Sequence, residues 1–107
     1  TGDDATAVDF LIAGGHGGIS VTANIAPKEL QKVYLSVIAG NIELAKNLNS
    51  QLENFHKNLF VEANPIPVKW ALHKMGKCEK GIRLPLLELS NEFKSIIEND
   101  LREINLL

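Results

Sequence analysis

The chain has 107 residues, of which 45% are hydrophobic and 22% charged, with 13 acidic and 11 basic side chains. These figures fit one globular domain and exclude low-complexity disorder, and a formal net charge of -2 argues against a nucleic-acid partner. The lone cysteine, Cys78, excludes an intrachain disulfide and indicates a reducing compartment, the cytoplasm. No apolar run approaches the roughly 20 residues that cross a bilayer. No basic stretch precedes an apolar run, so we expect neither a membrane span nor a signal peptide.

Residues 1–41 alternate helical and extended patterns. Apolar spacing predicts a helix over Ala5–Ala13, and the glycine-rich stretch 14–18 ends it. The β-branched run Gly18–Thr22 predicts the one strand of the chain. Pro27 suits the first turn of a second helix, which ends before Gly40.

Residues 42–107 carry only helical patterns. Apolar residues that step by three or four predict one long helix from Leu44 to Leu59. A short helix is expected over Val68–Met75 and a last one after Ser90. Because one strand cannot form a sheet, this order indicates the end of a parallel α/β fold whose earlier strands are absent. The chain, which begins at Thr1 rather than Met, is therefore expected to be a fragment.

Residue types that could carry chemistry have simpler interpretations. Asp3 and Asp4 could bind a metal or transfer protons, but helix capping is the commoner role of acids at this position. The glycines of residues 14–18 follow a helix and open a strand, the reverse of a phosphate-binding loop, so they are expected to form a turn. Lys69, beside Trp70, is expected to be a surface lysine and not a Schiff-base nucleophile.

The histidines and the cysteine do not predict a metal site. His16, His56, His73 and Cys78 have no ligand-like spacing, and the sequence contains no HExxH or CxxC motif. His56 and His73 are expected on the solvent side of their helices. We therefore expect no metal.

Several long motifs, taken in order, resemble the C-terminal part of the dihydrodipicolinate synthase family. They are GDDATA at residues 2–7, GGHGGISVTAN at 14–24, LFVE at 59–62, NPIPVKWAL at 64–72 and RLPL at 83–86. The resemblance is in register over nearly the whole chain and fades after about Leu87. Thr1 stands where Ser is usual, Gly18 where Val is usual and Ala63 where Pro is usual, and residues 87–88 replace a Thr-Pro pair.

The resemblance implies a (β/α)₈ barrel followed by a helical region. Such a barrel needs about 250 residues, so the chain would supply only the end of strand seven, helix seven, strand eight and helix eight. Residues 1–41 would then be the last βα units of the barrel, and residues 42–107 a C-terminal region of three helices. The chain itself would be mostly α-helical within an α/β fold, and the N-terminal part of the barrel would be its missing partner.

The resemblance also implies a reaction, the condensation of pyruvate with aspartate semialdehyde in lysine (diaminopimelate) biosynthesis. The lysine that forms the Schiff base and the tyrosine that relays protons would lie in the missing part, so the isolated chain should be inactive and contain no catalytic residue. No cofactor is implied. Ile19 matches a family position that contacts pyruvate, and Gly2 and Asp3 follow strand seven at the same end of the barrel. We expect these three residues to line the pyruvate pocket.

The resemblance also implies an oligomeric partner, and two alternative functions stay open beside it. The family is usually a homotetramer, and the helix over Ala5–Ala13 would be a contact surface. One alternative is a stand-alone helical interaction module without catalytic activity. The other is the equivalent part of a related pyruvate-dependent aldolase such as N-acetylneuraminate lyase.

Overall fold

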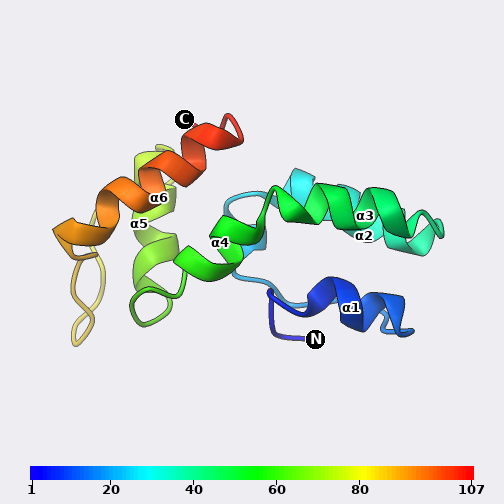
Figure 1. Cartoon of the computed structure of the whole chain (residues 1–107). Helices are drawn as coiled ribbons and strands as arrows, with labels where there is room; N and C mark the ends of the chain where they lie inside the picture. The colour runs from blue at the N-terminus through cyan, green and yellow to red at the C-terminus, as the bar shows by residue number, and fades with distance from the viewer.

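The computed structural model describes all 107 residues and contains helices only. The elements are α1 (Ala7–Ile12), the 3₁₀-helix η1 (Thr22–Asn24), α2 (Pro27–Ile38), α3 (Ile42–Ser50), α4 (Glu53–Asn58), α5 (Ile66–Lys74) and α6 (Asn91–Glu103). The molecule is elongated, about 42 × 27 × 21 Å, with α1, α2 and α3 at one end, α5 and α6 at the other, and α4 between them (Figure 1). None of the helices combines the length and hydropathy needed to cross a membrane.

The predicted strand at Gly18–Thr22 is not formed. Its first residues are extended without regular structure, and Thr22 already belongs to η1. The physical reason is the shortage of partners, since a strand needs a neighbour along its length. Only Thr1 lies beside it: the Thr1 ammonium donates to the Gly17 carbonyl (3.0 Å), and the Ile19 N–H donates to the Thr1 carbonyl (2.8 Å). This alternation is the hydrogen-bond pattern of two parallel strands.

The glycines that the sequence analysis placed at helix ends do end helices. Gly14 and Gly40 follow α1 and α2 with φ of +106° and +79°, a backbone conformation that favours glycine. In both cases the N–H groups of the glycine and of the next residue bond back to carbonyls in the last helical turn, as in a Schellman motif. The short chain reversal at Gly40 is what lets α2 and α3 pack side by side.

Two predicted helices differ from those observed. The long helix expected from Leu44 to Leu59 is divided into α3 and α4, so four helices follow α2 and not three. The division lies at Gln51 and Leu52, whose N–H groups bond to carbonyls three residues back, which tightens the turn and redirects α4 toward α6. α5 begins at Ile66, two residues earlier than expected, because Pro67 falls in the first turn, where its missing N–H is not needed.

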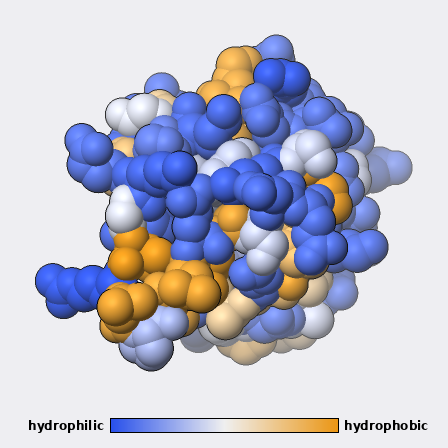
Figure 2. All heavy atoms as spheres, turned by 90° about the vertical axis from the view of Figure 1, so that its left-hand side faces the viewer, coloured by the Kyte–Doolittle hydropathy of each residue, from blue (hydrophilic) through white to orange (hydrophobic).

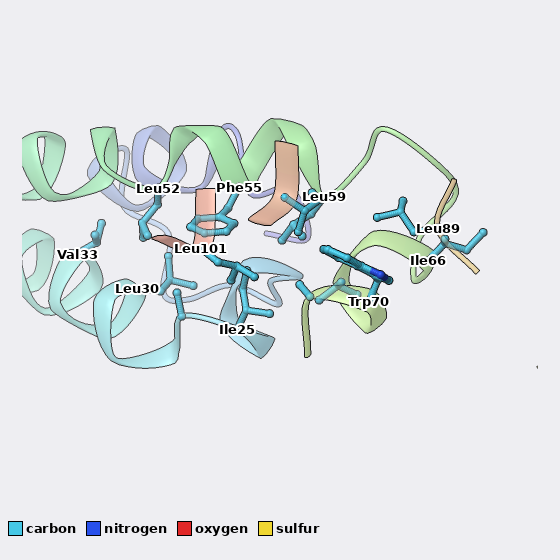
Figure 3. Close-up of a cluster of buried hydrophobic side chains, with 14 of the residues drawn as sticks. Ile25, Leu30, Val33, Leu52, Phe55, Leu59, Ile66, Trp70, Leu89 and Leu101 are labelled. Carbon is cyan, nitrogen blue, oxygen red and sulfur yellow. The ribbon is translucent and has the colours of Figure 1, made fainter. Parts of the chain in front are cut away.

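A core of 15 buried apolar side chains runs through the middle of the molecule. Phe55 of α4 and Leu59, which caps that helix, face Leu101 of α6, and Ile25 and Leu30 close the other side (Figure 3). The Asn58 amide also donates to the Asp100 carboxylate (2.7 Å), which joins α4 to α6. α4 is therefore the element around which both ends of the molecule pack.

Large apolar side chains nevertheless remain outside this core. Ile19, Leu84, Ile38 and Leu87 are 85%, 80%, 75% and 67% exposed. Leu84 and Leu87 belong to the loop that projects beyond α5 and α6 in Figure 1, and Figure 2, viewed from that end, shows apolar atoms gathered on the surface. Exposed apolar surface of this kind is typical of a chain that packs against further protein.

Gly18 and Tyr34 form a matched pair that can be tested by exchange. A Cβ at Gly18 would lie 2.6 Å from the Tyr34 hydroxyl, a buried group that has no hydrogen-bond partner. We expect Gly18→Val to lower the free energy of unfolding by about 1–3 kcal/mol, through overpacking. Adding Tyr34→Leu should recover most of that loss, as measured by urea unfolding. Strictly additive effects of the two substitutions would contradict this pairing.

Candidate functional site

A cavity of about 490 Å³ lies where the beginning of the chain meets α5. Its lining comes from three segments of the sequence: Gly2, Ile19, Ser20, Val21, Asn24, Asn64, Pro65, Val68, Lys69 and Leu72. Gly2 comes from the beginning of the chain, residues 19–21 and Asn24 from the extended segment and η1, and the rest from the first two turns of α5 with the residues before them. The volume lies within the range of small-molecule sites, about 300–1,000 Å³.

The structure brings two of the three predicted site residues to this cavity. Gly2 and Ile19 line it, and Ile19 presents most of its side chain to the open space. Asp3 does not line it. Its carboxylate accepts hydrogen bonds from the Thr6 N–H (3.2 Å) and the Thr6 hydroxyl, so in this chain it supports the beginning of α1.

Asp4, expected to cap a helix, instead holds the cavity wall. Its carboxylate is only 3% exposed and accepts from the Val21 N–H (3.0 Å), the Thr22 N–H (3.2 Å) and the Ser20 hydroxyl. A buried carboxylate needs such donors, because an unsatisfied charge in the interior is costly. These bonds connect the chain after Thr1 to the segment that enters η1.

His56 is the clearest departure from the sequence analysis, which placed it in solvent. It is 7% exposed, with Nδ1 2.9 Å from the Thr22 hydroxyl and Nε2 3.0 Å from Asn49 Oδ1. Burial lowers the pKa of His56 from its ordinary value, against the opposing effect of the negative charges of Asp4 and Glu53. The imidazole is therefore neutral near pH 7. No local pattern in the sequence indicates this burial, because α4 is mostly polar and His56 is buried by residues from other segments.

Two residues that the sequence analysis set aside line the cavity. Lys69 is the only charged residue among the lining residues and forms no ion pair. Asn64, expected only to form a turn, lies at the entry to α5.

No group of three or more His, Cys, Asp or Glu side chains is close enough to hold a metal ion. The arrangement offers an apolar wall with a few polar groups, which suits a small anionic molecule.

Comparison with known proteins shows to which family the chain belongs. The model of the dihydrodipicolinate synthetase family matches residues 1–104. The chain belongs to this family. The 4-hydroxy-tetrahydrodipicolinate synthase of Ruthia magnifica is 51% identical over the full 107 residues, which cover 36% of that protein.

Solved structures of the family superpose closely on the chain. The dihydrodipicolinate synthase of Acinetobacter baumannii, a chloride-inhibited enzyme in complex with pyruvate, matches 99% of this chain with a TM-score of 0.95 and 47% identity. That of Thermotoga maritima matches 99% with a TM-score of 0.96 and 42% identity. In both comparisons the chain covers 36% of the solved chain. It thus spans about a third of the length of the dihydrodipicolinate synthases that it matches.

Proposed function

We propose that this chain forms one wall of the pyruvate pocket in a 4-hydroxy-tetrahydrodipicolinate synthase. In this proposal the complete enzyme is a lyase that condenses pyruvate with aspartate semialdehyde in lysine (diaminopimelate) biosynthesis. The lysine that forms the Schiff base is supplied by protein outside the chain, so neither Lys69 nor Tyr34 takes a catalytic role. The chain alone is expected to be inactive.

The observation that carries the proposal is the cavity at Gly2 and Ile19. Family membership supports the enzyme class, and the pyruvate complex of the Acinetobacter baumannii enzyme supports the ligand. The parallel-type hydrogen bonds between Thr1 and residues 17–19 support the assignment of these segments to the ends of strands seven and eight of a (β/α)₈ barrel. Active sites of such barrels lie at the carboxyl ends of the strands, and the segments proposed as those strand ends contribute Gly2 and residues 19–21 to the cavity.

The exposed apolar surface supports the partners that we propose. Residues 1–41 would complete the barrel and residues 42–107 would form the helical region beside it. The bare side chain of Ile19 would then be covered by the remaining strands and by substrate. Phe10 and Ile12 of α1 are 45% and 38% exposed, which supports α1 as a contact surface in a homotetramer. The free thiol of Cys78 agrees with a cytoplasmic location.

A fusion enzyme tests the proposal directly. In it, this chain replaces the matching C-terminal third of the Acinetobacter baumannii synthase. We expect the fusion enzyme to condense pyruvate with aspartate semialdehyde and to form a tetramer in analytical ultracentrifugation. Absence of turnover in a folded fusion enzyme would contradict the proposal. Turnover of pyruvate with N-acetylmannosamine in place of aspartate semialdehyde would favour the N-acetylneuraminate lyase branch.

A substitution at Ile19 tests the contact with pyruvate. Ile19→Asp places a carboxylate where the anionic substrate binds, and two like charges about 4 Å apart repel by about 4 kcal/mol at a protein surface. We expect the KM of the fusion enzyme for pyruvate to rise at least about 100-fold. Leu84→Asp is the control, because Leu84 is similarly exposed but does not line the cavity. If both variants had the same KM for pyruvate, Ile19 would not be part of the pyruvate-binding site.

A further inference from the structure

Hydrogen bonds continue from the cavity wall into the helices behind it. Val21 lines the cavity, and its N–H donates to Asp4. The next residue, Thr22, donates its own N–H to Asp4 and contacts His56 through its hydroxyl. His56 in turn contacts Asn49 of α3. The wall is therefore held from two sides, by Asp4 at the beginning of the chain and by His56 on α4.

The contact between Thr22 and His56 lies in the buried interior of the molecule. Thr22 has no exposed surface, so its hydroxyl takes its hydrogen-bond partner from the protein. His56 follows Phe55, which is 1% exposed, and α4 is anchored by that ring and by Leu59. Because α4 is fixed by the core, any group that it holds is fixed with it.

The hydrogen bonds also fix the protonation of the imidazole. The side-chain oxygen of Asn49 can only accept, so His56 Nε2 carries the proton. Nδ1 then has a free lone pair and accepts from the Thr22 hydroxyl. Thr22 is held in one rotamer with its hydroxyl proton directed at α4, and the backbone on either side of it is restrained accordingly.

We propose that His56 is a positioning residue for the cavity wall, which it holds in place through the Thr22 hydroxyl. The hydrogen bonds of His56 go to Thr22 and Asn49, neither of which lines the cavity, so its effect on the ligand is indirect. That the ligand is pyruvate rests on the proposed function, whereas the restraint on residues 20–22 rests on the hydrogen bonds alone. A shift of about 1 Å in such a wall can lower the catalytic efficiency, kcat/KM, by up to about 100-fold.

Two amide substitutions separate the two contacts of the imidazole. The oxygen of His56→Asn lies as many bonds from the backbone as Nδ1, so it can accept from Thr22 but cannot reach Asn49. The nitrogen of His56→Gln corresponds to Nε2, so it can reach Asn49 but leaves Thr22 without its acceptor. His56→Ala removes both contacts.

Kinetics of the fusion enzyme distinguish positioning from general stability. We expect His56→Ala and His56→Gln to raise the KM for pyruvate about 10-fold, and His56→Asn to stay within about 3-fold of the parent. A purely structural role would lower the amount of active enzyme, and thus the apparent kcat, at constant KM. Thr22→Val, which keeps the shape of the side chain, should raise the KM as His56→Gln does. The Thr22→Val/His56→Gln double variant should be no worse than either single variant.

Hydrogen exchange tests the same restraint without activity. In the His56→Ala and His56→Gln variants, the amides of residues 20–23 should exchange about 10-fold faster than in the parent, because their local opening becomes easier. His73→Ala is the control, since His73 bonds to the Cys78 carbonyl (3.2 Å) away from the wall, and should leave this segment unchanged. If the unsubstituted fusion enzyme is inactive, the proposed function fails while the exchange rates still decide this inference. Equal effects of the Asn and Gln variants on exchange, or unchanged exchange in His56→Ala, would overturn it.

Discussion

Replacing Asp4 by alanine should lower the free energy of unfolding of the chain by about 3 kcal/mol. The substitution leaves the buried Thr22 N–H, and the partly buried Val21 N–H and Ser20 hydroxyl, without their acceptor. An unsatisfied buried donor costs about 1–3 kcal/mol, so the sum is large for one residue. Urea unfolding followed by far-UV circular dichroism measures the change.

The neighbouring acid provides the matched control for this experiment. Asp3 is exposed, and its carboxylate bonds only to the N–H and hydroxyl of Thr6 at the beginning of α1. Asp3→Ala should cost about 0.5–1 kcal/mol, the usual value of a lost helix cap. If both alanine variants lose the same stability, the Asp4 carboxylate does not hold the wall as the structure indicates.

Replacing Phe55 by alanine should have the largest effect of any single core substitution. The ring is 1% exposed and lies between Leu52 and Leu59, which cap the two ends of α4, and Leu101 of α6 (Figure 3). Removing it leaves a void that these neighbours cannot close, and buried Phe→Ala changes typically cost about 3–5 kcal/mol. We expect that loss in the same urea unfolding measurement, together with a weaker packing of α4 on α6.

Phe60 is the control for Phe55, because the same residue type lies five positions further along at 49% exposure. Phe60→Ala should change the free energy of unfolding by less than about 1 kcal/mol, since little apolar surface returns to water. A large loss for Phe60→Ala with a small one for Phe55→Ala would mean that the core does not lie where the structure has it.

Much of the local structure can be read from the sequence because its causes lie within a few residues. Gly14 and Gly40 end helices for a conformational reason that needs no distant partner. The apolar periodicity of α2 and α6 is likewise local, since one face of a helix repeats every three or four residues. The division between α3 and α4 was not predicted, because the leucine spacing continues across the turn at Gln51.

The candidate site could be predicted only in part. The resemblance of the motif around Ile19 to a family pattern predicted that Gly2 and Ile19 lie together, and both line the cavity in the structure. Their contact with pyruvate stays a prediction. The other side, at Asn64 and Lys69, comes from a helix more than 40 positions later in the chain. No local pattern links two segments that far apart.

The sequence by itself determined the helical composition of the chain, the glycine helix ends and the membership of its motifs in one family. Each depends on backbone preference, on side-chain periodicity or on residues in a linear order. Only the tertiary structure decided that Gly18–Thr22 does not form a strand, that Asp4 holds the cavity wall and that His56 is buried against Thr22. Those outcomes depend on which distant groups are available as hydrogen-bond partners. Only the packed core brings the His56 Nδ1 atom to 2.9 Å from the Thr22 hydroxyl oxygen.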